Sequence, residues 1–119
     1  MNLTYKIEMH PKGVSVISLK GKILAEEAFD EVFDVVETKI QVGEKNFIVN
    51  LKDISHINSS GLNVLLRLFT RIRNKGGEMI LIHPSKVVNQ LFIISKLNTV
   101  FKIGADENDA LKQLIAQEA

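Results

Sequence analysis

The spacing of apolar residues in this chain switches repeatedly between two periods, one typical of strands and one typical of helices. Leu3, Tyr5, Ile7 and Met9 alternate with polar residues, which is typical of a strand with one buried face. From Ala25 onward the apolar residues recur at every third or fourth position, which indicates one face of a helix. Because both patterns return along the chain, the sequence predicts an α/β fold in which helices pack on a sheet.

The remaining segments continue this alternation. After a turn at residues 11–13, a second strand is predicted from Val14 to near Gly21, and the short connection favours an antiparallel hairpin. The helix from Ala25 should end before Gly43. The later predicted elements are a strand at 47–51, a loop at 52–58, a helix from the serines at 59–60 to a stop at 74–77, a strand at 79–82, a helix capped by Ser85, a strand at 100–103 and a helix capped by Asp106.

The predicted order is therefore β-β-α-β-α-β-α-β-α in a single domain that spans residues 1–119. Strands separated by helices imply parallel, right-handed crossover connections. We expect these parallel βα units to lie beside the N-terminal hairpin in one mixed β-sheet. A length of 119 residues suits one domain, for which about 100–150 residues are usual.

Composition excludes several classes of chemistry. The chain has no cysteine, so it can form neither disulfides nor thiolate sites, and no spacing of His, Asp and Glu matches a metal motif. We expect no metal and no cofactor. The 15 basic and 14 acidic residues give a net charge of +1, which argues against nucleic-acid binding. No apolar stretch approaches the roughly 20 residues of a membrane span, so we expect a cytoplasmic protein without membrane insertion.

The segment most informative about function reads Asp53-Ile-Ser-His-Ile-Asn-Ser-Ser-Gly-Leu62. It leads from the end of a predicted buried strand into a helix, and sites in α/β sheets usually lie at such strand ends. Ser59 and Ser60 fall at the helix N-terminus, where unpaired amides and the helix dipole stabilise an anion such as phosphate. A purely structural interpretation also fits, because Asn58, Ser59 or Ser60 could be a simple N-cap.

This segment resembles the signature of the STAS domain, as found in anti-sigma factor antagonists. The family pattern is roughly Asp-Leu-Ser, two variable residues, and then Asp-Ser-Ser-Gly-Leu before an apolar helix. The resemblance covers nearly the whole chain and includes the order of the elements. It also includes the Gly76-Gly77-Glu78 stop and the run Val88-x-x-Leu91-Phe92-x-x-Ser95-x-Leu97, followed by Val100-Phe101.

The resemblance implies a phosphorylation-controlled protein-interaction switch that is not itself an enzyme. In this family the first serine of the Ser-Ser-Gly motif is phosphorylated, which here is Ser59, with Ser60 as the second choice. The partner is an anti-sigma factor that is also a serine kinase, and it transfers phosphate from ATP. A phosphatase removes this phosphate. The unphosphorylated antagonist binds the anti-sigma factor and frees the sigma factor.

The residues that the resemblance assigns to the site form two groups. We name the first group the switch loop, and it comprises Asp53, Ser55, His56, Asn58, Ser59, Ser60, Gly61 and Leu62. The second is a candidate partner surface at Lys22, Ile23 and Leu24. We expect the protein to be a monomer or a weak homodimer.

Three positions depart from the family pattern. Asn58 stands where many members have Asp, which removes a charge beside the candidate phosphate acceptor. Lys22 stands where many members have an acidic residue, so the charge of the partner-facing surface differs. Lys96 replaces a common glycine, for which we expect only a local effect on a turn.

Two alternative interpretations of these residues exist. Asp53, His56 and Ser59 suggest a hydrolase triad, but the chain lacks the Gly-x-Ser-x-Gly elbow of α/β-hydrolases. STAS domains also occur as scaffold components, transporter regulators and ligand-binding modules, without a sigma-factor pathway. Such a protein could cover its apolar residues with a different partner. The candidates are Ile23, Leu24, Ile93 and Ile94. They fit the core equally well, and for any one apolar residue the core is the more frequent location.

Overall fold

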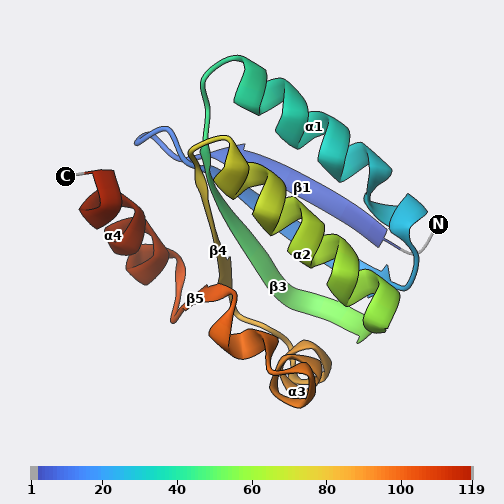
Figure 1. The fold of residues 1–119 in the computed structure, drawn as a ribbon. Coiled ribbons are helices and arrows are strands. Elements are labelled where there is room, and N and C mark those ends of the chain that lie inside the picture. Colours follow the sequence, from blue (N-terminus) through green and yellow to red (C-terminus); the bar gives the residue numbers. More distant parts are fainter. Residues whose placement is uncertain (1–2, 119) are drawn as a thin grey trace.

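The computed structural model describes the backbone of residues 3–118 and the side chains of residues 3–115. It contains one sheet with the strand order β1-β2-β3-β4-β5 (Figure 1). β1 is antiparallel to β2, and every other neighbouring pair is parallel. The predicted mixed sheet, with a hairpin beside parallel βα units, is confirmed. The strands are β1 (Leu3–Met9), β2 (Ser15–Ile23), β3 (Asn46–Ile57), β4 (Glu78–Ile82) and β5 (Lys102–Gly104).

The helices follow the predicted order. They are α1 (Asp30–Gln41), α2 (Ser59–Asn74), α3 (Lys86–Ser95) and α4 (Glu107–Glu118), with short 3₁₀ helices η1 (Glu26–Phe29) and η2 (Leu97–Thr99). The predicted cap of α4 is present, because the Asp106 carboxylate accepts a hydrogen bond from the Asp109 amide at 2.8 Å. Ser85 precedes α3 as predicted, but its hydroxyl donates to the Ile54 carbonyl at 2.7 Å and does not cap the helix.

The prediction of a loop at residues 52–58 is wrong, because β3 continues to Ile57. This extension pairs in parallel with the end of β2, which itself runs past Gly21 to Ile23. The pairing satisfies the backbone groups, while most side chains of the extension remain exposed. Its sequence is mostly polar, with Ile54 buried, and lacks the apolar run of a strand covered on both faces. β5 also begins two residues later than predicted, at Lys102.

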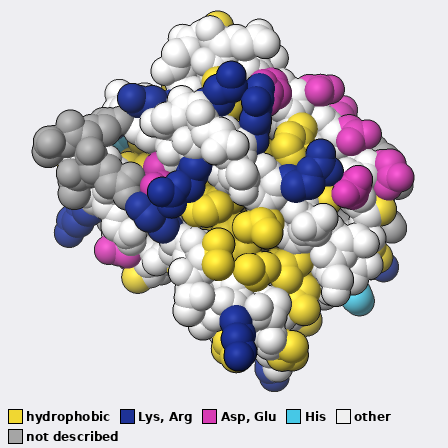
Figure 2. Space-filling model, viewed as in Figure 1, with side chains coloured by type: hydrophobic (Ala, Val, Ile, Leu, Met, Phe, Trp, Pro, Cys, Tyr) yellow, Lys and Arg dark blue, Asp and Glu magenta, His cyan; other side chains and the backbone are white. Residues whose placement is uncertain are grey.

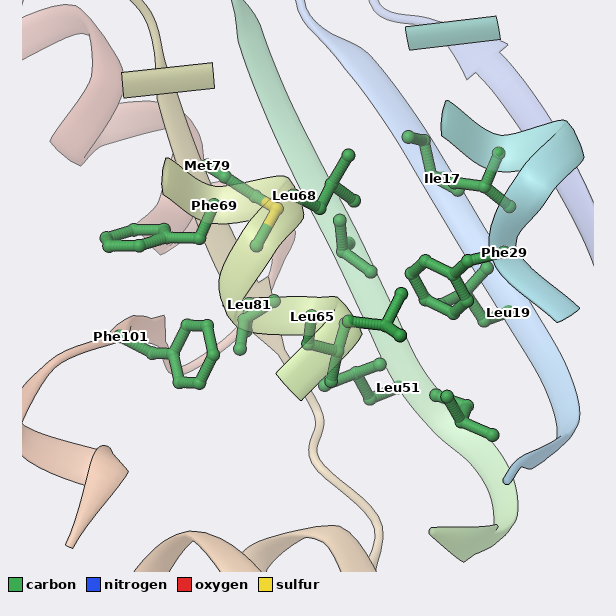
Figure 3. Close-up of a cluster of buried hydrophobic side chains, with 14 of the residues drawn as sticks. Ile17, Leu19, Phe29, Leu51, Leu65, Leu68, Phe69, Met79, Leu81 and Phe101 are labelled. Carbon is green, nitrogen blue, oxygen red and sulfur yellow. The ribbon is translucent and has the colours of Figure 1, made fainter. Parts of the chain in front are cut away.

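Two apolar clusters pack on opposite faces of the sheet. The larger lies between the sheet and helices α1, α2 and α3, and Leu65 and Leu68 of α2 are wholly buried in it (Figure 3). The smaller includes Leu111 and Leu114 of α4 against Ile80 of β4. Among the described residues, no helix combines the length and apolarity that a membrane span needs.

Charged side chains connect α1 to α2 at the surface. Arg71 donates to both carboxylate oxygens of Glu37, with Nη2 at 2.9 Å from Oε2. This hydrogen bonding lowers the pKa of the Glu37 carboxyl below its ordinary value. Arg67 lies 5.5 Å from the centre of the Phe33 ring and 3.3 Å from a carboxylate oxygen of Glu26. Arg67 and Arg71 of α2 thus both have acidic partners within the protein.

Candidate functional site at the start of α2

Asn58 connects the start of α2 to the end of β2. It is the N-cap residue, and its Oδ1 accepts a hydrogen bond from the Gly61 amide at 2.9 Å. Its Nδ2 donates to the Leu24 carbonyl at 3.1 Å, and its backbone amide donates to the Ile23 carbonyl at 3.4 Å. The helix cap, which the sequence left open among three residues, is therefore Asn58. An aspartate here could accept from Gly61 but could not donate to Leu24.

Gly61 allows α2 to begin directly against β2. A Cβ atom at this position would lie 2.0 Å from the carbonyl oxygen of Ile23, so a larger residue cannot fit without moving the backbone. Leu62 and Leu65 hold the first turns in place, with 6% and 0% of their surface exposed. The position of the switch loop thus depends on the close contact between the backbone of Gly61 and the backbone carbonyl of Ile23.

Ser59 and Ser60 occupy the first two positions of α2, and both residues are exposed. Because Asn58 provides the cap, neither serine is needed for it. The first turn of α2 contains no acidic side chain, so the positive end of the helix dipole is not neutralised there. A phosphate on either serine would meet a favourable local field.

Asp53, Ser55 and His56 lie on the exposed extension of β3. The Ser55 hydroxyl donates to the Gly21 carbonyl at 3.2 Å, and His56 Nδ1 lies 3.0 Å from the same hydroxyl oxygen. Within residues 3–118 no hydrogen bond joins Asp53, His56 and Ser59. The described residues thus lack the base-to-nucleophile contact that a hydrolase triad requires.

The candidate partner surface separates into buried and exposed parts. The Ile23 side chain is wholly buried, so this residue contributes its carbonyl group and no apolar surface. Leu24 is 40% exposed, and Lys22 lies opposite His56 in the pairing of β2 with β3. Lys22 near the end of β2, and Leu24 just after it, therefore border the switch loop.

The expectation that Leu24, Ile93 and Ile94 are core residues is wrong. Ile93 and Ile94 are 57% and 78% exposed, because Val88 and Phe92 form the inner face of α3. Figure 2 shows hydrophobic side chains exposed between α2 and α3. The exposure of Ile93 and Ile94 could have been predicted from the sequence. The helical spacing of Val88 and Phe92 on the inner face leaves positions 93 and 94 on the outer face. Lys96, which follows α3, has a left-handed backbone conformation with φ of 65°, where glycine is favoured.

Replacing Asn58 by alanine removes both side-chain hydrogen bonds and is expected to cost about 1–2 kcal/mol of folding stability. Asn58→Asp keeps the cap and should cost less, because only the bond to Leu24 is lost. Urea unfolding of the two variants beside wild type measures the difference. Equal stability of all three proteins would contradict the assigned role of Asn58.

Comparisons with known proteins agree with this architecture. A model of the STAS domain family matches residues 6–110. The chain is 32% identical, over 96% of its length and 97% of the relative, to an anti-sigma F factor antagonist from Paenibacillus polymyxa. It also resembles the solved structure of the anti-sigma factor antagonist SpoIIAA in its unphosphorylated form, with 25% identity and a TM-score of 0.76 over 95% of this chain and 97% of that chain. The phosphorylated form of SpoIIAA from Bacillus, also 25% identical, gives a TM-score of 0.70 over 92% of this chain and 98% of that chain.

Proposed function

We propose that this chain, which belongs to the STAS domain family, is an anti-sigma factor antagonist controlled by phosphorylation at Ser59. In its unphosphorylated form it binds an anti-sigma factor, and in its phosphorylated form it is released. The anti-sigma factor acts as the serine kinase and transfers phosphate to Ser59 from the ATP that it binds, and a phosphatase restores the binding form. The role of the relatives supports the antagonist part of this proposal.

The choice of Ser59 over Ser60 rests on its place as the first serine of the Ser-Ser-Gly motif. Its exposure at the first position of a helix that Asn58 already caps supports this choice. A kinase can reach the hydroxyl without breaking the cap. The added group brings about 1.5–2 negative charges to the positive end of a helix dipole, which the fold tolerates well. Ser60 is exposed at the next position and is the second choice.

The negative charge of a phosphate on Ser59, which the fold tolerates, would disfavour binding of the partner. The switch loop, Lys22 and Leu24 lie together at the ends of β2 and β3, so a partner docked there would cover Ser59. Burying a new dianion in that interface requires its desolvation, and any acidic group of the partner would repel it. Phosphorylation therefore weakens binding locally and needs no change of fold.

Native co-purification with mass spectrometry tests the antagonist role. Tagged wild-type protein and Ser59→Ala are expected to retain an ATP-binding serine kinase of the anti-sigma type. Ser59→Asp should retain much less of it, while the neighbouring variant Ser60→Ala behaves as wild type. Retention of a transporter or scaffold subunit in place of the kinase would contradict the proposal.

A further inference from the structure

β1 is an open edge of the sheet. It is the terminal strand in the sheet order and pairs only with β2 among the described residues. Its seven residues therefore leave a row of backbone amide and carbonyl groups facing outward, which is a template for another strand. The opposite edge is less suitable, since β5 has only three residues.

The side chains of β1 have a charge pattern that is complementary to itself. Lys6 and Glu8 lie two residues apart, so they share one face of the sheet. Their side chains are 75% and 66% exposed, and their charged atoms are 3.7 Å apart. On the other face, Tyr5 and Ile7 pack partly against the core, while Met9 is 48% exposed.

We propose that β1 is a self-association edge, to which a second copy of this chain adds its own β1 in antiparallel register. With the two-fold axis at Ile7, Lys6 lies opposite Glu8 of the second copy, and Glu8 opposite its Lys6. Ile7 then meets its own equivalent, and Tyr5 lies opposite Met9 of the second copy. Opposite charges that face each other across an antiparallel pair stabilise it, and like charges destabilise it.

The segment of β1 that can pair in this register is short. Pairing extends over residues 5–9 only, because the chain turns away after Met9 at Pro11, which has no amide hydrogen to donate. The short pairing predicts a weak dimer in which the two sheets are continuous. Its ionic contacts are exposed, so salt should weaken the association.

The proposed edge is independent of the switch loop. Met9 pairs with Ser15, which pairs with Phe47 at the start of β3, whereas Leu3 pairs with Gly21 at the end that carries Asn58. The paired segment thus lies toward the end of the sheet opposite Ser59. A dimer formed there leaves the switch loop open to its own partner, so either proposal can fail without the other.

Sedimentation equilibrium over a concentration series tests the proposal by comparing wild type with two variants in which one charge of β1 is reversed. Wild type is expected to dimerise, while Lys6→Glu and Glu8→Lys should each dimerise about tenfold more weakly or worse. Mixing these two variants in equal amounts should restore association, because both acidic side chains of one variant then face basic side chains of the other. Lys12→Glu, an equal charge change in the exposed turn beyond β1, serves as the control and should behave as wild type.

Three results would overturn the proposal. The first is a wild-type protein that remains monomeric at every concentration. The second is dimerisation that neither single variant weakens, which would locate the interface elsewhere. The third is a mixture of Lys6→Glu and Glu8→Lys that associates no better than either variant alone.

Discussion

Gly61→Ala is expected to lower the free energy of unfolding by roughly 3 kcal/mol. The added Cβ would lie 2.0 Å from the Ile23 carbonyl oxygen. This oxygen belongs to the backbone of a paired strand, so it cannot move aside as a flexible side chain would. The start of α2 must shift instead, which also disturbs the hydrogen bonds of Asn58 to Gly61 and Leu24. Urea unfolding measures the loss.

Gly77→Ala is the matched control for this prediction. Its Cβ would lie 2.0 Å from the Lys45 carbonyl oxygen, a comparable clash beyond the other end of α2. We expect both variants to lose stability, but only Gly61→Ala to lose partner affinity when both are compared under conditions where they remain folded. Wild-type stability of Gly61→Ala, or equal affinity losses in the two variants, would contradict the assigned role of this contact.

Ser59→Asp is expected to weaken binding to the anti-sigma factor about 100-fold, which corresponds to about 2.8 kcal/mol. A carboxylate at the first position of α2 resembles the phosphate in the sign of its charge, and a docked partner would have to bury it. The folding stability should not fall, because a negative charge at a helix N-terminus stabilises the helix by about 0.3–1 kcal/mol. Calorimetry measures the affinity, and thermal unfolding measures the stability.

Two variants make the Ser59→Asp measurement specific. Ser59→Ala should bind like wild type, since it adds no charge. Thr70→Asp places the same charge on an exposed residue farther along α2 and should also bind like wild type. Unchanged affinity of Ser59→Asp, or a loss explained by unfolding of that variant, would refute the electrostatic account of release.

The order of the elements could be predicted because burial produces recognisable apolar patterns, which are helical spacing in the helices, alternation in β1 and an unbroken apolar run in β4. Val88 and Phe92, for example, mark the inner face of α3. The extension of β3 to Ile57 could not be predicted this way, because its backbone is paired while most of its side chains are exposed. Periodicity reports burial, and it does not report hydrogen bonding of an exposed strand.

The candidate site, too, could be predicted from the sequence only in part. The adjacent serines and the glycine are visible in the sequence, and the family resemblance assigns them a role. The contacts that position them involve the carbonyl groups of Ile23 and Leu24 on a distant segment. Every residue has a backbone carbonyl, so the sequence does not show which carbonyl accepts a hydrogen bond. That Asn58 both caps α2 and donates to Leu24 is therefore known only from the structure. Its amide gives a physical reason why a neutral residue is compatible with this position.

Phosphorylation of Ser59 is tested by a map of phosphorylation sites after incubation with the cognate anti-sigma factor and ATP. We expect phosphate on Ser59, no incorporation into Ser59→Ala, and normal incorporation into Ser60→Ala. Phosphate on any other residue with Ser59 unmodified, or no phosphate while the two proteins form a stable complex, would contradict this expectation.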